Sequence, residues 1–286
     1  MMSCNKLVYT KLERKRTEVE LKSKKMLGLD KDGVIVDLKD ILYIQRQRGF
    51  LKYGIKFEYD KDAVHHVGGI YGYNGSTAQF KALYAFGLWF EHNKPNGITK
   101  NEAFKKLIAR PDAKKRLDAI ISKYMSQSDL DLASKMSHWD NGKTFYGDEF
   151  LHLIKPCEGA KDALIGLCNL YNGNVAIITN TVRLETVKRD LEIIGLSRKD
   201  VNDIVIINNA NKPNPESLDN AINNLKMKKG DACFVGDNVS DVQTAQNSGV
   251  ASVGVLTGMS TLKHLKNAGA DAVATGIKEF YHLVRN

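Results

Sequence analysis

The sequence lacks the features that would place the protein in a membrane, on a secretory route or among disulfide-rich scaffolds. No apolar run approaches the ~20 residues that a membrane-spanning helix needs, and no apolar segment follows the charged N-terminus as in a secretory signal. No two cysteines have Cys-x-x-Cys spacing and none lies in a Cys/His cluster, which is typical of free thiols in a reducing compartment. The four are Cys4, Cys157, Cys168 and Cys233. We therefore expect a cytoplasmic protein without a membrane partner.

Positive charge is concentrated at one end of the chain. The 286 residues carry a net charge of +9. Residues 1–25 hold eight Lys or Arg and three Glu, which makes +5 and leaves +4 for the rest of the chain. We interpret this segment as a basic N-terminal extension. Contact with nucleic acid is one interpretation of it, but a solvated segment is favoured, because charge runs are usually solvated.

Hydrophobic periodicity divides the remaining chain into a helical block and an α/β part. A short apolar strand at 26–29 is followed by residues 38–155, which have mostly helical patterns. From residue 156 the pattern changes to apolar strands that alternate with helices, as in a parallel sheet buried on both faces. The sequence therefore predicts an α/β fold. A Rossmann-like, doubly wound parallel sheet is expected in 26–37 and 156–286, with an all-helical cap domain inserted at 38–155.

Two carboxylates follow the first predicted strand directly. The chain continues from residues 26–29 as Asp30–Gly33 (Asp-Lys-Asp-Gly), and open α/β sheets bind ligands at the carboxyl ends of their strands. Asp-x-Asp-Gly also opens calcium loops of the EF-hand type, but those need a further oxygen ligand and a later Glu. Here Val34 and Ile35 follow, and no such Glu is present. An acidic surface turn remains an open interpretation of this motif taken alone.

Three later strand ends also carry polar residues. These are Thr179 and Asn180, then Lys212–Pro215 (Lys-Pro-Asn-Pro), and then Gly236 and Asp237 with Asp241 four residues on. In a parallel sheet such ends lie along one edge, so residues far apart in sequence can converge there. Each motif alone has an ordinary interpretation, as a strand-end cap, a surface lysine or a helix cap. Their occurrence together, at successive strand ends, favours a shared site.

These four motifs, in this order, resemble those of the haloacid dehalogenase (HAD) superfamily of phosphohydrolases. The matching segments are Asp30–Asp37 (Asp-x-Asp-Gly-x-x-x-Asp), the apolar run that ends at Thr179, Lys212–Pro215, and Gly236–Asp241 (Gly-Asp-x-x-x-Asp). The helical block resembles the helical cap that follows the first motif in this superfamily. Within it, the chain most resembles the group of phosphoglycolate phosphatase and β-phosphoglucomutase, and the resemblance covers roughly Met26 to the C-terminus.

The resemblance implies a role for each motif residue. Asp30 would attack phosphorus and form an aspartyl-phosphate. Asp32 would protonate the leaving oxygen and then take a proton from the hydrolytic water. The Thr179 hydroxyl and the Asn180 backbone amide would hydrogen-bond phosphoryl oxygens. Lys212 would offset the charges of the nucleophile and the phosphoryl group.

Mg²⁺ is the cofactor that the resemblance implies. Its ligands would be the Asp30 carboxylate, the Asp32 backbone carbonyl and Asp237, with Asp241 supporting the metal site. The presence of Asp32 favours phosphate-ester chemistry over that of the dehalogenases and phosphonate hydrolases, which lack this second acid. Lys31 departs from the apolar residue often found between the two acids, and its consequence for specificity or activity stays open.

Substrate choice is expected to rest with the cap, because the core motifs contact only the phosphoryl group. Residues 68–77 lie roughly where related enzymes have a substrate-facing cap loop. The polar candidates there are His65, His66, Tyr73 and Asn74. Ordinary cap surface is an equally good interpretation of these residues.

The sequence therefore predicts a Mg²⁺-dependent phosphatase that acts on a small phosphorylated metabolite, such as phosphoglycolate or a sugar phosphate. A phosphomutase of the β-phosphoglucomutase type is the alternative, because it uses the same two aspartates and returns the phosphoryl group to the sugar. A nucleic-acid-binding protein on an inactive core is a less favoured alternative. We expect a monomer or a homodimer.

Overall fold

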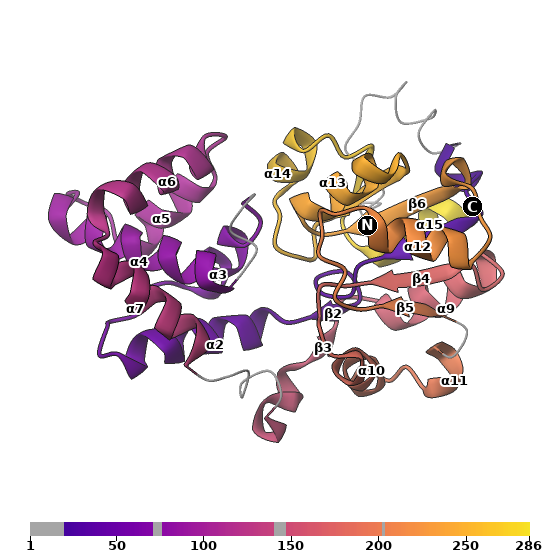
Figure 1. Cartoon of the computed structure of the whole chain (residues 1–286), viewed down its shortest axis with the longest axis horizontal. Coiled ribbons are helices and arrows are strands. Elements are labelled where there is room, and N and C mark those ends of the chain that lie inside the picture. Colours follow the sequence, from indigo (N-terminus) through magenta and orange to yellow (C-terminus); the bar gives the residue numbers. More distant parts are fainter. Residues whose placement is uncertain (1–19, 71–75, 140–146, 202–203) are drawn as a thin grey trace, which may run out of the picture. The chain divides into compact units, whose positions relative to one another are not determined.

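The chain divides into two compact units, which are described separately below (Figure 1). The computed structural model describes residues 20–70, 76–139, 147–201 and 204–286. The core unit contains the chain up to Leu38, Ile154–Gly258 and Leu265–Asn286. The helical unit contains Lys39–Leu153 and Met259–His264.

Six parallel strands form the sheet of the core unit, in the spatial order β5-β4-β1-β6-β7-β8 (Figure 1). Their bounds are β1 Met26–Leu29, β4 Val175–Ile178, β5 Val205–Ile207, β6 Ala232–Gly236, β7 Ala251–Val255 and β8 Ala272–Ala274. β1 is a central strand, and its Leu29 is in register with Ile177 of β4 and Val235 of β6. The chain therefore leaves these three strands at the same edge of the sheet. The predicted α/β fold, a doubly wound parallel sheet with inserted helices, is confirmed.

Helices cover both faces of the sheet. From β1 the chain builds outward through β4 and β5, and it then returns to build β6, β7 and β8 on the other side of β1. Because parallel crossovers are right-handed, this reversal places the two sets of connecting helices on opposite faces. α12 (Glu216–Asn224) and α13 (Val239–Ser248) pack against each other and against the sheet, whereas α15 (Ile277–Arg285) packs against α9 (Ala160–Leu170). The remaining helices here are α10 Leu184–Ile193, α11 Arg198–Val201, η2 Lys229–Asp231 and, at the unit boundary, α14 Leu262–Asn267.

A short antiparallel ladder joins the two segments of the core unit on either side of the inserted helices. β2 (Val36–Asp37) pairs with β3 (Lys155–Pro156). The Cys157 amide continues this pairing by donating a hydrogen bond to the Ile35 carbonyl at 3.0 Å. The chain thus leaves the core unit after β2 and re-enters it at a neighbouring strand.

The helical unit is organised around one long helix, α4, which packs against α6 and α7. The helices are α2 Lys39–Lys52, α3 Lys61–Val67, α4 Ser76–Asn93, α5 Lys100–Ile108, α6 Ala113–Tyr124 and α7 Gln127–His138, followed by the 3₁₀ helix η1 Asp148–Leu153. Buried phenylalanines fill the space between them, and Phe104 meets Phe86 with ring centroids 4.9 Å apart. This unit therefore has an aromatic core of its own, separate from the core around the sheet.

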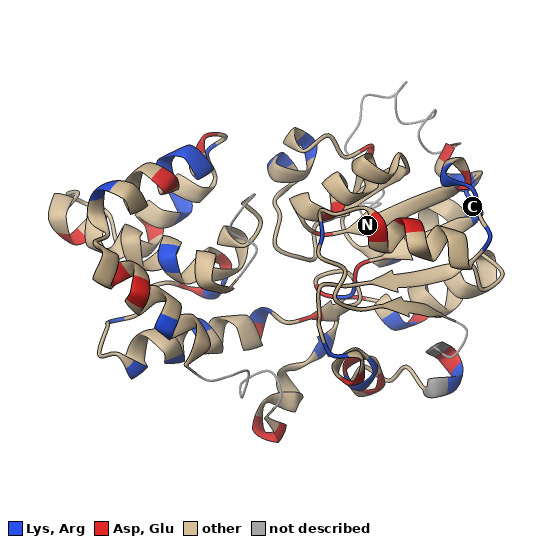
Figure 2. Ribbon diagram, in the orientation of Figure 1, with Lys and Arg blue, Asp and Glu red and all other residues tan. Residues whose placement is uncertain are grey.

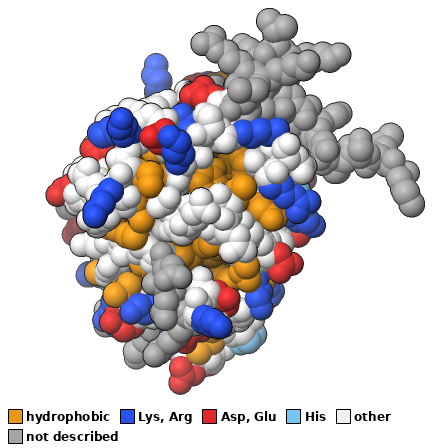
Figure 3. Space-filling model, turned by 90° about the vertical axis from the view of Figure 1, so that its right-hand side faces the viewer, with side chains coloured by type: hydrophobic (Ala, Val, Ile, Leu, Met, Phe, Trp, Pro, Cys, Tyr) orange, Lys and Arg blue, Asp and Glu red, His pale blue; other side chains and the backbone are white. Residues whose placement is uncertain are grey.

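The described part of the basic extension packs on the core unit. Leu21 is buried, and the Lys25 amide donates a hydrogen bond to the Asp231 carbonyl at 2.7 Å. Most of the extension, residues 1–19, lies outside the described residues. On the face in Figure 3, Lys and Arg side chains are interspersed with Asp and Glu, and both signs also occur along the ribbons of Figure 2. Among the described residues, no helix has the length and apolarity needed to cross a membrane.

Candidate active site

The Asp30–Gly33 loop turns sharply at the carboxyl end of β1. Two amides, those of Ile35 and Val36, donate to the Lys31 carbonyl at 2.9 Å each. Gly33 has a φ of 78°, a conformation that glycine adopts without strain. The Thr257 hydroxyl donates to the Gly33 carbonyl at 2.5 Å. The loop is therefore fixed both by its own backbone and by the segment after β7.

Lys212 joins two of the predicted site carboxylates. Its Nζ lies 2.9 Å from Asp30 Oδ1 and 2.6 Å from Asp241 Oδ1, and all three side chains are buried. The Lys212 backbone amide donates to Asn180 Oδ1 at 2.9 Å, so the loop after β4 holds the lysine-bearing loop. Burial alone would lower the pKa of Lys212, but the carboxylates of Asp241 and Asp30 raise the pKa above its ordinary value. The lysine is therefore a fixed positive charge beside Asp30.

Three carboxylates form a buried cluster. Single oxygens of Asp30, Asp237 and Asp241 all lie within 4.8 Å of one another. Burial raises the pKa of Asp30 to about 7, Lys212 opposes this rise, and the neighbouring carboxylates of Asp241 and Asp32 add to it. Like charges held this close in a buried site favour the uptake of a proton or a cation. Oxygen donors of this kind are the ligands that Mg²⁺ and Ca²⁺ prefer.

Glycines shape the walls around two of these carboxylates. A Cβ on Gly258 would lie 2.0 Å from Asp237 Oδ2, and one on Gly33 would lie 2.7 Å from the same oxygen. A Cβ on Gly236 would lie 2.2 Å from Asp241 Cβ. The Asp237 carboxylate is therefore packed between two backbone segments that approach it closely because neither carries a side chain.

We expect Gly258→Ala to impair any function of Asp237 and also to lower stability. The added methyl would lie 2.3 Å from Asp237 Cβ as well as 2.0 Å from its Oδ2, so the backbone must shift and the carboxylate loses its position. A misplacement of about 1 Å at a reacting centre can lower activity about 100-fold. Turnover and thermal unfolding of the purified variant measure the two effects separately.

Gly230→Ala is the matched control, because a Cβ there meets nothing within 4 Å. It should leave turnover unchanged. Full activity of the Gly258→Ala variant would show that the position of Asp237 does not matter for the reaction.

The Asp32 carboxylate points to a different set of partners from the cluster. Its Oδ1 lies 2.7 Å from Lys31 Nζ, and its Oδ2 accepts a hydrogen bond from the Thr181 hydroxyl at 3.2 Å. Thr181 in turn accepts one from the Thr179 hydroxyl at 3.2 Å. The Asp32 side chain is about one-third exposed, whereas Thr179 is buried. Asp32 is thus held beside the cluster by side chains from the loops that follow β1 and β4.

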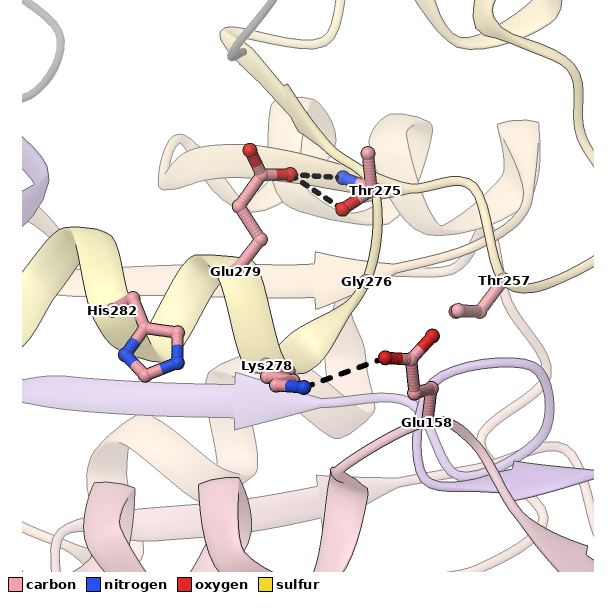
Figure 4. Close-up of a pocket in the computed structure, with 7 residues that line it drawn as sticks. All are labelled: Glu158, Thr257, Thr275, Gly276, Lys278, Glu279 and His282. Atoms are coloured by element: carbon pink, nitrogen blue, oxygen red, sulfur yellow. Dashed lines mark hydrogen bonds and ion pairs between the residues drawn. The ribbon is translucent and has the colours of Figure 1, made fainter. Parts of the chain in front are cut away.

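A small cavity of the core unit is lined by residues that follow β7 and β8 and by residues of α15 (Figure 4). It has a volume of about 210 Å³, and Thr257, which holds the Asp30–Gly33 loop, is one of its lining residues. Lys278 pairs with Glu158 at 3.4 Å, and Glu279 accepts a hydrogen bond from the Thr275 hydroxyl at 2.7 Å. With two carboxylates and one lysine in its wall, this cavity is not suited to an anionic phosphate group.

The structure places two of the four cap candidates, His65 and His66, in the helical unit. His65 and His66 belong to α3, which begins after the N-cap Asp60. His65 is buried, and burial lowers the pKa of the half-buried His66. Tyr73 and Asn74 lie outside the described residues. A role for these residues in substrate choice stays a prediction.

Several residues of the site were not predicted from the sequence. Thr181 lies two residues beyond Thr179, and a polar run after a strand was the only signal for it. Asp190 pairs with Lys31 at 2.6 Å and is 159 residues away from it in sequence. Thr257 and Gly258 follow β7 without any motif. Close packing at a sheet edge brings these residues together, and no sequence spacing indicates it.

Comparisons with known proteins agree with this arrangement. A model of the haloacid dehalogenase-like hydrolase family matches residues 84–255. The chain is 26% identical over 157 residues to "Pyrophosphatase PpaX" of Listeria monocytogenes serotype 4a (strain HCC23), which covers 52% of this chain and 70% of the relative. A PpaX of Halalkalibacterium halodurans is 34% identical over 102 residues, covering 34% of this chain and 45% of the relative.

Solved structures with the same fold cover nearly the whole chain. One, from Lactobacillus delbrueckii subsp. bulgaricus and described as a phosphoglycolate phosphatase, has a TM-score of 0.64 at 16% identity. The match covers 92% of this chain and 98% of that one. Another, from Thermotoga maritima and described as a β-phosphoglucomutase, has a TM-score of 0.53 at 18% identity and covers 91% and 98%. At such identities the likeness shows the fold.

A parallel α/β sheet with acids, a hydroxyl and a lysine at one edge defines a hydrolase of the class predicted from the motifs. The family match spans more than half of the chain, and the chain belongs to the haloacid dehalogenase-like hydrolases. The predicted HAD superfamily is therefore confirmed, and so is the enzyme class, a HAD-type phosphatase.

Proposed function

We propose that the protein is a Mg²⁺-dependent phosphatase that hydrolyses a small phosphorylated metabolite through an aspartyl-phosphate. The observation that carries this proposal is the buried Lys212 ammonium between Asp30 and Asp241, within the cluster completed by Asp237. A nucleophile, a fixed cation and a set of metal-binding oxygens are the parts that phosphoryl transfer needs.

In the first step the Asp30 carboxylate attacks phosphorus. A bond forms between a carboxylate oxygen and phosphorus, and the bond from phosphorus to the leaving oxygen breaks. Asp32 gives its proton to that leaving oxygen, so the product departs as an alcohol and Asp32 becomes a carboxylate. Lys212 lies 2.9 Å from Asp30 and offsets negative charge as the phosphoryl group approaches.

In the second step water releases the phosphoryl group. The Asp32 carboxylate takes a proton from the water, whose oxygen forms a bond to phosphorus. The bond between phosphorus and Asp30 breaks, and the electron pair returns to the Asp30 carboxylate. Inorganic phosphate leaves, and both aspartates regain their starting protonation states. The Thr179 hydroxyl and the Asn180 amide are proposed to hold phosphoryl oxygens in both steps.

The carboxylate cluster fits Mg²⁺ by its chemistry. All of its donors are oxygens and all three side chains are buried, and such hard donors suit Mg²⁺. Asp30, Asp237 and the Asp32 carbonyl are the proposed ligands, with Asp241 in support. When bound, the ion would neutralise negative charge on the phosphoryl oxygens.

The substrate is proposed to be small and phosphorylated. Phosphoglycolate and sugar phosphates are candidates from the motifs, and pyrophosphate joins them because the related PpaX proteins are named pyrophosphatases. A nucleic-acid-binding protein on an inactive core is not favoured, because the acids of the predicted motifs are all present.

Metal removal and a substrate screen test this proposal together. We expect phosphate release from at least one of phosphoglycolate, sugar phosphates, nucleotides, pyrophosphate and p-nitrophenyl phosphate in the presence of Mg²⁺. Chelation with EDTA should lower the rate about 100-fold or more, because the ion supplies several kcal/mol of charge stabilisation. Added Mg²⁺ should restore it.

Two other results would change the assignment. No phosphate release from any substrate at any metal concentration would overturn the phosphatase proposal. Isomerised sugar phosphate from β-glucose 1-phosphate, without net phosphate release, would favour the phosphomutase.

A further inference from the structure

Lys31, the residue between the two acids of the first motif, is enclosed by an ion network of the core unit. Its Nζ lies 2.7 Å from Asp32 Oδ1 and 2.6 Å from Asp190 Oδ2, and its side chain is only 1% exposed. Asp190 belongs to α10 and is also buried. Arg189 donates to Asp190 Oδ1 at 2.8 Å, so the network contains two cations and two carboxylates.

The charges of this network account for the burial of Lys31. Lysine is almost never fully buried unless it is paired, because an unpaired ammonium loses its hydration without compensation. Asp190 compensates Lys31 from one side and is itself held by Arg189. The ion pair with Asp190 of α10 therefore holds the ammonium in place independently of Asp32.

The ammonium distinguishes the two oxygens of Asp32. The Lys31 ammonium, which has donors and no acceptor, lies 2.7 Å from Oδ1 and so places its positive charge beside that oxygen. The other oxygen, Oδ2, faces the Thr181 hydroxyl at 3.2 Å, and a hydroxyl can both donate and accept. The two oxygens therefore have different neighbours, Lys31 at Oδ1 and Thr181 at Oδ2, which fixes the orientation of the carboxyl group.

We propose that Lys31 and Asp190 are positioning residues that fix the orientation of the Asp32 carboxyl group, with Lys31 at Oδ1 and Thr181 at Oδ2. The proposal rests on the proposed phosphatase function, in which Asp32 gives a proton to the leaving oxygen. Asp190 acts on Asp32 only through Lys31. Asp190 of α10 thus acts through Lys31 on one oxygen of the acid, and Thr181, in the loop after β4, contacts the other.

The dependence of rate on the leaving group tests this role. Phenyl phosphate and p-nitrophenyl phosphate have similar shapes. The nitrophenolate leaving group departs without protonation, whereas departure of the more basic phenolate depends on protonation by a general acid. kcat/KM reports only the steps up to formation of the aspartyl-phosphate. For Lys31→Met we expect kcat/KM to fall about 50-fold on phenyl phosphate, within the range of a misplaced catalytic group. On p-nitrophenyl phosphate it should fall about threefold or less, because general-acid catalysis contributes little there.

Asp190→Asn provides a second route to the same result. It removes the anchor of Lys31 and should shift the ratio of the two kcat/KM values in the same direction by a smaller factor. Added to Lys31→Met, it should shift the ratio no further, because residues that act in series are not additive. Asp219→Asn is the control, since it breaks the 2.9 Å ion pair with Lys229 elsewhere in the core unit. It should leave the ratio unchanged.

The outcomes separate this inference from the proposed function. If the wild-type protein hydrolyses neither ester with any metal, the phosphatase proposal fails and this inference fails with it. If the wild type hydrolyses both and the variants lose both activities equally, only the positioning role is overturned. Because Asp190→Asn leaves the Asp30–Gly33 motif intact, it decides the question even if the Lys31→Met protein does not fold.

Discussion

Replacement of Asp30 by asparagine is expected to abolish turnover, with a fall in kcat of about 10⁴-fold or more, the scale seen when a nucleophile is removed. The amide has the shape of the carboxylate but not its nucleophilic oxygen. Its carbonyl can still accept the hydrogen bond that the Lys31 amide donates to Asp30 Oδ1 at 2.7 Å. Lys212 keeps Asp241 as a partner at 2.6 Å, so the fold should persist.

Two measurements make the Asp30→Asn result specific. Acid quenching of the wild type during turnover should trap phosphate on the protein, and the variant should trap none. Thermal unfolding should show a folded variant, and Asp219→Asn should keep wild-type turnover. If Asp30→Asn retains near-normal turnover, the aspartyl-phosphate mechanism is wrong.

Lys212→Met is expected to lower kcat about 1,000-fold and to destabilise the protein. The first effect follows because a fixed donor beside developing negative charge contributes about 10²- to 10³-fold. The second follows because removal of one member of a buried ion pair leaves the other uncompensated, at a cost of about 3 to 5 kcal/mol in the free energy of unfolding. Here Asp30 and Asp241 would both lose their shared counter-ion.

The pH dependence of unfolding identifies the cause. In the folded protein the pKa of Asp30 is already raised to about 7, above that of the unfolded chain, and loss of Lys212 would raise the pKa further. The folded variant therefore binds more protons than the unfolded chain, so its stability falls as pH rises from about 4 through 7 and above. Urea unfolding at pH 5 and pH 8, without metal, should show a smaller deficit at pH 5.

Lys229→Met is the matched control for this experiment. Lys229 pairs with Asp219 at 2.9 Å, but its side chain is half exposed. Exposed pairs contribute about 0–1 kcal/mol, so little change is expected at either pH. A Lys212→Met protein with wild-type stability and turnover would show that the buried lysine has neither role.

The predictable parts of the site are the residues that directly follow a strand, because the position of the strand fixes theirs. Met26–Leu29 is an apolar run that forms a fully buried strand, and Asp30 follows it directly. Asp241 shows why an ordinary interpretation and a functional one need not compete. Its Oδ2 accepts from the Asn238 amide at 2.9 Å as a helix cap, and its Oδ1 meets Lys212. The sequence suggested both interpretations, and one carboxylate serves both.

The parts that were not predictable depend on tertiary contacts between distant segments. Nothing in the sequence around Asp190 marks it as the partner of Lys31, because a helix residue gains such a partner only when the helix packs on the sheet. Gly258 has no motif, and its role follows from the 2.0 Å that a Cβ would leave to Asp237 Oδ2. Spacing within a segment is visible in a sequence, whereas the approach of two segments is not.

The pairing of β2 with β3 lowers the entropic cost that the inserted helices impose on folding of the core unit. Strand pairing holds Asp37 and Lys155 next to each other. The residues between them therefore form one insertion whose two ends are already close together. The entropic cost of bringing the ends of such an insertion together grows only with the logarithm of its length. The intervening helices can therefore become longer, shorter or fewer without a change in the pairing of β2 and β3, so the continuity of the core does not depend on what lies between these strands.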